Sequence, residues 1–142
     1  TDVITSTGLG PQLGIGYGGA VVRDGKVYIL DRDDQKGDQM RCFDLATGRE
    51  LWNYAYDAPG TVSFPGSRSV PVTDGTYVWS CGPYGDLYCF DVLKQKPVWN
   101  KNVWKDFGGR EIPDWAISQC PLIYGDLLIL ASQAPQAGVV VS

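Results

Sequence analysis

The stretch AVVRDGKVYIL, residues 20–30, decides the fold of this chain because its pattern returns twice along the 142 residues. Its glycine, Gly25, is followed by Gly75 and by Gly125 at intervals of fifty residues. Aspartate precedes the first two glycines, tyrosine precedes the third, and apolar residues flank each pair. This pattern is typical of two strands joined by a tight hairpin turn. We expect the three glycines at equivalent turns of successive structural units.

A second marker follows the hairpin in the first two units. The sequence CFD at 42–44 leads to Trp52, and CFD at 89–91 leads to Trp99, with the same Cys-to-Trp spacing of ten. Each unit therefore has room for four short strands. We expect them near 19–23, 26–31, 40–44 and 50–54, then near 69–73, 76–81, 86–90 and 97–101, and finally near 118–123 and 126–132, with the chain ending inside a third strand.

Strands such as VYIL at 27–30 are apolar on both faces, so both faces must be covered. Blades of four antiparallel strands stacked around an axis provide that cover, whereas a two-sheet sandwich gives no reason for the repeat. We therefore predict an all-β chain of β-propeller blades, with a repeat of about fifty residues and an incomplete ring. The predicted division is the end of a preceding blade and a linker at 1–18 (its last strand near 1–7), blades at 19–66 and 67–116, and a partial blade at 117–142.

Composition excludes several classes of function. The chain carries 12 basic and 16 acidic residues, and its net charge of −4 lacks the basic stripe of a nucleic-acid-binding protein. It contains no histidine, which removes Ser-His-Asp triads, histidine bases and histidine zinc ligands. The longest apolar runs are far too short to span a membrane.

The turn that follows the first CFD carries a family resemblance. The sequence DLATGRELW at 44–52 resembles the tryptophan-docking motif of pyrroloquinoline-quinone-like repeat proteins, and GSRSVP at 66–71 and KDFGG at 105–109 are similar to stretches of bacterial members. The second unit has Lys-Gln at 94–95 in place of the motif's Thr-Gly, which puts its turn geometry in question. The resemblance implies that an indole locks each blade to its neighbour, through the residues Asp44, Thr47, Gly48 and Trp52 in the first unit and Asp91 and Trp99 in the second.

The same resemblance leaves three functions open. One is a non-catalytic binding or scaffold propeller for protein partners, like the outer-membrane assembly lipoprotein with this fold. Another is part of a dehydrogenase that holds pyrroloquinoline quinone and calcium, and the third is a carbohydrate- or polymer-binding accessory module. We expect the first, with no cofactor, in an extracytoplasmic compartment such as the periplasm or the cell surface of a bacterium. Its partners would be proteins, the remaining blades of the same propeller, or further copies of the chain.

Candidate ligand-binding residues lie just before predicted inner strands, where propeller loops reach the central funnel. Arg68 precedes the inner strand of the second unit, and Trp115 and Gln119 precede that of the third. An arginine beside an aromatic ring can hold an anionic or planar ligand, whereas the alternative is packing between blades. No residue qualifies as catalytic, and we assign no metal ligands.

Two further features have both structural and functional interpretations. The acidic run at 31–34 suits a calcium ion or, more simply, a solvated hairpin loop. The cysteines Cys42, Cys81, Cys89 and Cys120 are too widely spaced for a CxxC site. They are interpreted as small buried residues within strands, with one or two disulfides as the alternative.

Overall fold

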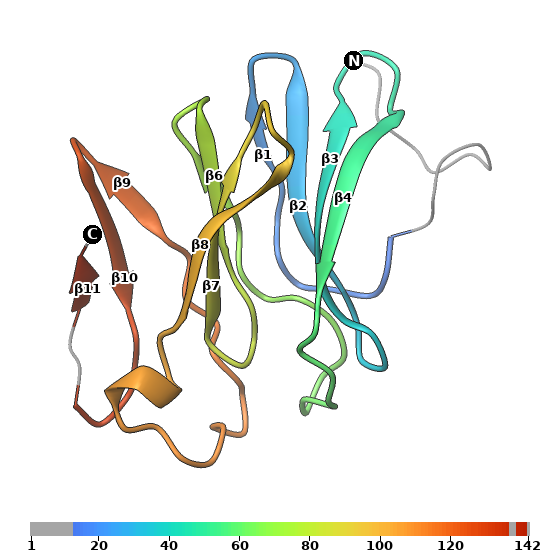
Figure 1. The fold of residues 1–142 in the computed structure, drawn as a ribbon. Coiled ribbons are helices and arrows are strands. Elements are labelled where there is room, and N and C mark those ends of the chain that lie inside the picture. Colours follow the sequence, from blue (N-terminus) through green and yellow to red (C-terminus); the bar gives the residue numbers. More distant parts are fainter. Residues whose placement is uncertain (1–12, 137–138, 142) are drawn as a thin grey trace.

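The computed structural model describes residues 13–136 and 139–141, and the strand expected near 1–7 lies outside this part of the chain. Three antiparallel sheets stand side by side, and the strands of each are hydrogen-bonded in chain order (Figure 1). The first sheet contains β1 (Val21–Arg23), β2 (Lys26–Asp33), β3 (Gly37–Asp44) and β4 (Glu50–Tyr56). The second contains β5 (Val72–Thr73), β6 (Tyr77–Cys81), β7 (Asp86–Asp91) and β8 (Lys96–Asn102), and the third contains β9 (Leu122–Tyr124), β10 (Leu127–Ala131) and β11 (Val139–Val141).

The prediction of an all-β chain built from propeller blades is confirmed. Within the described residues, helical structure is limited to the single turn η1 (Lys105–Phe107), and no helix there is long and apolar enough to cross a membrane. The third expected strand of the last unit is present as β11. The division of the chain at 19–66, 67–116 and 117–142 stays a prediction.

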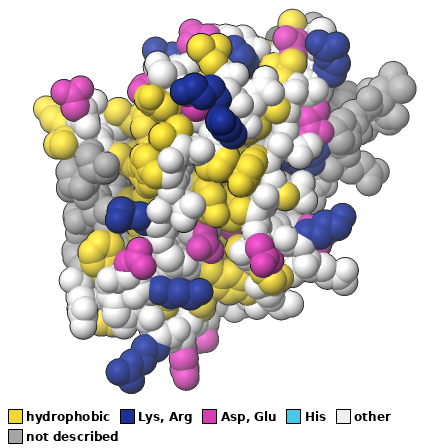
Figure 2. Space-filling model, viewed as in Figure 1, with side chains coloured by type: hydrophobic (Ala, Val, Ile, Leu, Met, Phe, Trp, Pro, Cys, Tyr) yellow, Lys and Arg dark blue, Asp and Glu magenta, His cyan; other side chains and the backbone are white. Residues whose placement is uncertain are grey.

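The hydrophobic cores lie in the seams between successive sheets. In Figure 2 hydrophobic side chains gather over these seams, with Lys and Arg side chains spread around them. The first seam, between the first and second sheets, buries Tyr28, Leu30, Met40, Cys42, Trp52, Tyr56, Ala58, Val78, Phe90 and Val92. The second seam, between the second and third sheets, buries Cys81, Leu87, Val103, Trp104, Ile117, Leu128, Leu130 and Ala134.

The step from the first sheet to the second is not the fifty residues of the glycine spacing. The pairing of Val21 with Tyr28 corresponds to that of Val72 with Trp79, so Tyr28 has the position of Trp79. A fifty-residue alignment would match Tyr28 with Val78, which points to the opposite face of its sheet. Since side chains alternate along a strand, this one-residue slip decides which residues face which seam.

The same slip changes the hairpin turns. In the first sheet the paired residues Arg23 and Lys26 enclose Asp24 and Gly25, whose φ angles of 49° and 71° fit a type I′ turn. In the third sheet Tyr124 pairs with Leu127, so Gly125 holds the first turn position instead of the second. The glycines therefore lie at hairpin turns, but Gly25 and Gly125 are not at equivalent turn positions.

The residues of the docking motif occupy matching places in the first two sheets. Trp52 pairs with Cys42 and Trp99 with Cys89, and a register shift follows each cysteine. Trp52 is buried in the first seam, where its ring centroid lies 6.2 Å from that of Phe90 in the second sheet. Trp99 is partly buried and packs against the second seam.

The turns before these tryptophans have the same form despite their different sequences. Asp44 accepts hydrogen bonds from the Thr47 hydroxyl and amide at 2.7 and 2.8 Å, and these bonds hold the pKa of its carboxyl below the usual value. Asp91 accepts from the amides of Leu93 and Lys94, and its pKa is lowered likewise, chiefly by the Lys94 amide. Gln95 takes a φ of 57° where Gly48 has 70°. The aspartate bonds thus preserve the turn without glycine.

A charged pair that the sequence analysis did not identify is buried at the edge of the first seam. Arg32 donates to Asp38 at 2.8 Å and to the carbonyl of Gly60 at 2.7 Å, and the side chains of both charged residues are fully buried. The guanidinium also lies 5.0 Å from the ring centroid of Tyr84, in the β6–β7 turn of the second sheet. Burial raises the pKa of Asp38 to about 6, although Arg32 acts to lower it.

Replacing Trp52 tests the docking motif. Trp52→Ala should lower the free energy of unfolding by about 3–5 kcal/mol, because it removes a large ring from a packed seam. Leu93→Ala is the control, since Leu93 is 88% exposed and should change stability by less than about 0.5 kcal/mol. Urea unfolding measures both, and similar small effects would show that Trp52 has no docking role.

The Asp38 carboxyl should make stability depend on pH. Its folded-state pKa of about 6 exceeds the ordinary 3.8, so its contribution is fully present below about pH 4 and is lost as pH rises through 6. The difference in unfolding free energy between wild type and Asp38→Asn should therefore shift toward the wild type by about 1–2 kcal/mol on going from pH 7 to pH 4. A difference that is constant with pH would contradict this assignment.

Candidate binding surface

Three segments that lead into the innermost strands run side by side from one sheet to the next. We call residues 13–20, 63–71 and 114–121, which precede β1, β5 and β9, the lead-in segments. The amides of Tyr17 and Gly18 donate to the carbonyl of Ser67 at 2.7 and 3.0 Å. The Ser69 hydroxyl donates to the carbonyl of Gln119 at 2.7 Å. These bonds tie each segment to the next, so the loops of three sheets form one surface.

Close packing between the first two lead-in segments requires glycine. A Cβ atom on Gly18 would collide with the backbone carbonyl oxygen of Ser69 and lie 3.2 Å from the hydroxyl of Ser67. A Cβ atom on Gly66 would likewise collide with the carbonyl of Ile15. Small residues at these positions therefore allow adjacent segments to hydrogen-bond.

Aromatic side chains gather on the lead-in segments. Phe64 and Trp115 are stacked, with ring centroids 5.4 Å apart and an interplanar angle of 13°. Tyr17 meets Phe64 edge to face at 6.3 Å. Tyr17 is 65% and Trp115 68% exposed, and Phe64 is also exposed. We call these three residues together with Arg68 the aromatic surface.

Two of the three predicted ligand-binding residues belong to this surface. The guanidinium of Arg68 lies 5.9 Å from the Tyr17 ring centroid, and its Nη1 donates to the carbonyl of Gly66 at 3.1 Å. Its Nη2 is buried without a hydrogen-bond partner. Trp115 joins through its stack with Phe64, whereas Gln119 contributes a backbone carbonyl to Ser69. A ligand-binding role for these residues stays a proposal.

Sequence reasoning missed Tyr17 and Phe64. Both precede predicted inner strands, as Arg68 and Trp115 do, so their position in the repeat was a usable signal. The hydroxyl of Ser63 donates to the carbonyl of Asp114, which joins the second and third segments beside the stacked rings. Only this pairing of distant segments brings the rings of Tyr17, Phe64 and Trp115 together.

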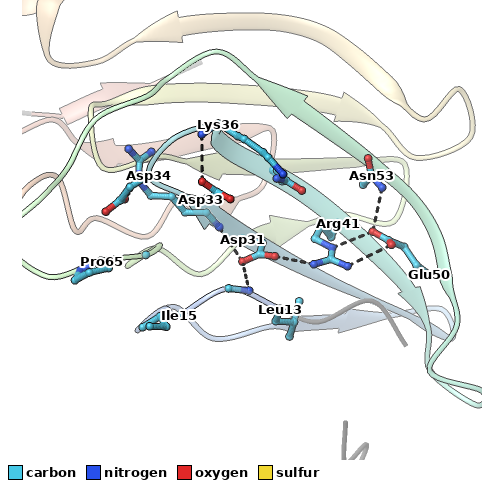
Figure 3. Close-up of a pocket in the computed structure, with 14 residues that line it drawn as sticks. Leu13, Ile15, Asp31, Asp33, Asp34, Lys36, Arg41, Glu50, Asn53 and Pro65 are labelled. Carbon is cyan, nitrogen blue, oxygen red and sulfur yellow. Dashed lines mark hydrogen bonds and ion pairs between the residues drawn. The ribbon is translucent and has the colours of Figure 1, made fainter. Parts of the chain in front are cut away.

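A shallow hollow of about 670 Å³ lies beside the first lead-in segment, lined by Leu13, Ile15 and charged side chains of the first sheet (Figure 3). Within it Arg41 donates to Asp31 at 2.7 Å and to Glu50 at 2.9 Å. Asp31 also accepts from the amide of Gly14. The charged groups of the hollow therefore bind one another, and none of these carboxylates points unpaired into the hollow.

The acidic run at 31–34 is not the solvated loop that we expected. Asp31 and Asp33 lie within β2, and Asp31 forms an ion pair with Arg41. Asp34 forms an ion pair with Arg32 at 3.0 Å. Within the part of the chain that the structure describes, no three Asp, Glu, Cys or His residues are grouped as metal ligands.

The cysteines are free thiols in this structure. Cys42, Cys81 and Cys89 are buried in strands, as the structural interpretation of the sequence expected. Burial raises the pKa of Cys42 to about 11 and of Cys89 to about 12, so both are protonated at neutral pH. Cys120 differs, because it lies before β9 and is exposed. Its sulfur accepts a hydrogen bond from the amide of Val70.

Comparison with solved structures defines the class of fold. No family model and no curated protein matches the chain. BamB from Moraxella catarrhalis superposes with a TM-score of 0.53 at 18% identity, covering 78% of this chain and 29% of BamB. A quinohemoprotein alcohol dehydrogenase from Comamonas testosteroni gives 0.56 at 19% identity, covering 83% and 17%. The computationally designed Ika4 protein gives 0.58 at 13% identity, covering 87% and 62%.

These likenesses establish the fold alone. The sheets are blades of a β-propeller, as in BamB and the quinohemoprotein dehydrogenase. The chain spans less than two thirds of the length of each of these three proteins. The activities and partners of the whole proteins therefore come to this chain only as proposals.

The contact between lead-in segments predicts a difference between two adjacent glycines. Gly18→Ala should cost about 1–3 kcal/mol of unfolding free energy, because its methyl group meets the backbone of the next segment. Gly19→Ala is a matched control, since its methyl group would make only an ordinary contact of 3.4 Å with Val70. Urea unfolding of both variants checks this, and equal costs would mean that the segments do not pack as described.

Proposed function

We propose that this chain is a non-catalytic β-propeller module that binds protein partners through its aromatic surface. The supporting observation is that Tyr17, Phe64 and Trp115, from three successive lead-in segments, remain exposed while they contact one another. Aromatic and arginine side chains are enriched at the centres of protein interfaces, where they contribute most of the binding energy. Exposed apolar patches of this kind mark interaction sites.

The packing of the surface suits binding because it is formed in advance. The stack of Phe64 on Trp115 limits the rotamers of both rings, so a partner would not have to order them. Arg68 is held between the Gly66 carbonyl and the Tyr17 ring. A positive group at the edge of an apolar surface favours a partner with acceptor oxygens next to its own apolar residues.

Compartment and alternatives follow from the resemblance of the docking motif. The proposal places the module outside the cytoplasm, because the motif at 44–52 resembles that of bacterial quinone-binding repeat proteins. Other blades, or other copies of the chain, are proposed partners of the sheets themselves. An exposed indole also stacks on a quinone or a sugar ring, so a pyrroloquinoline-quinone dehydrogenase and a carbohydrate-binding module remain as alternatives that need their own measurements.

A photocrosslinker at position 115 tests the proposal directly. Benzoylphenylalanine in place of Trp115 should give an adduct of defined mass with one protein, when the variant is irradiated in an extract of the source cells. Benzoylphenylalanine in place of Leu93 is the control, since Leu93 is exposed in the β7–β8 turn at the opposite end of the second sheet. Adding Arg68→Ala to the first variant should reduce its adduct several-fold.

Two outcomes would contradict the proposal. Equal adducts from positions 115 and 93, or none from position 115, would remove the aromatic surface as a protein-binding site. Separately, titration with pyrroloquinoline quinone and calcium, or with cello-oligosaccharides, is followed by absorbance and thermal shift. Saturable binding that stabilises the fold, lost in Trp115→Ala, would favour the dehydrogenase or the carbohydrate-binding module instead.

A further inference from the structure

The third sheet has an apolar face that no described residue covers. Strands β9 and β10 direct Ile123, Leu128 and Leu130 into the second seam. The alternate residues Leu122, Tyr124 and Leu127 point to the other side and are exposed, Tyr124 by 74%. Leu122 pairs with Ile129 and Tyr124 with Leu127, so these four side chains share one face. We call this the forward face of the third sheet.

The two existing seams show what such a face packs against. In the first seam the forward face of the first sheet, which carries Tyr28 and Trp52, meets the back face of the second, which carries Val78 and Phe90. In the second seam the forward face of the second sheet meets the back face of the third, with Leu128 and Leu130. Each sheet thus seats an apolar back face on the forward face of the sheet before it.

The first sheet offers a back face of the same kind. Val27 pairs with Phe43 on this face, in the way that Val78 pairs with Phe90 on the back face of the second sheet. Val22 pairs with Val27 and is exposed. The back face of the first sheet therefore has the residues that fill a seam, at the positions that fill the first seam.

We propose that the forward face of the third sheet docks on the back face of the first sheet in a second copy of this chain. Each copy has one face of each kind, so two copies make two identical seams and leave neither face uncovered. Two copies bring six sheets, which falls within the range of roughly four to eight blades that close a propeller. This inference is independent of the aromatic surface, which lies on the lead-in segments.

Sedimentation and light scattering over the micromolar range test the second copy. The wild type should have the mass of two chains. Tyr124→Glu on the forward face and Val22→Glu on the back face should each weaken dimerisation at least tenfold, because each places a charge in both seams. Leu93→Glu, in a turn outside both faces, should leave the dimer unchanged. All substituted side chains are exposed, and circular dichroism confirms folding.

Mixing the two variants distinguishes this arrangement from any other dimer. In a mixed pair the intact forward face of Val22→Glu meets the intact back face of Tyr124→Glu, so one seam is restored and dimers should reappear. A dimer joined through two forward faces would be broken by Tyr124→Glu, unaffected by Val22→Glu and not rescued by mixing. That result, a monomeric wild type, or open chains of more than two copies would overturn the proposal.

Discussion

The structure depends on the need to cover both faces of every sheet. The strands carry apolar side chains in both directions, so a sheet alone would leave one apolar face in water. Packing each sheet against the next removes Tyr28, Trp52, Val78 and Phe90 from solvent together. The stability of one blade is therefore largely shared with its neighbours, as in other repeat proteins.

Polar groups in and beside the seams fix how the sheets are placed. Arg32 and Asp38 are buried where the first sheet meets the β6–β7 turn of the second, and a buried ion pair tolerates few arrangements. At the inner edge the hydrogen bonds between lead-in segments act in the same way. The aromatic surface is a consequence, because the stack of Phe64 on Trp115 needs both segments at one spacing.

Part of the candidate site was accessible from the sequence. Arg68 and Trp115 were selected because they precede inner strands, and both lie on the aromatic surface. Tyr17 and Phe64 have the same kind of position, yet nothing in one sequence indicates which rings will meet. The acidic run at 31–34 was misjudged because its partner Arg41 lies on the neighbouring strand, which local composition does not reveal.

The sequence by itself determined the class of fold, since hairpin glycines, strand patterns and the Cys-to-Trp spacing are local and repeat. It also located the docking tryptophans. Only the tertiary structure decided that the first two sheets differ by one residue in register, that Gln95 adopts the conformation of Gly48, and that Arg32 pairs with Asp38. The reason is physical: spacing along the chain records which strands form, whereas packing across a seam selects the face that each side chain occupies.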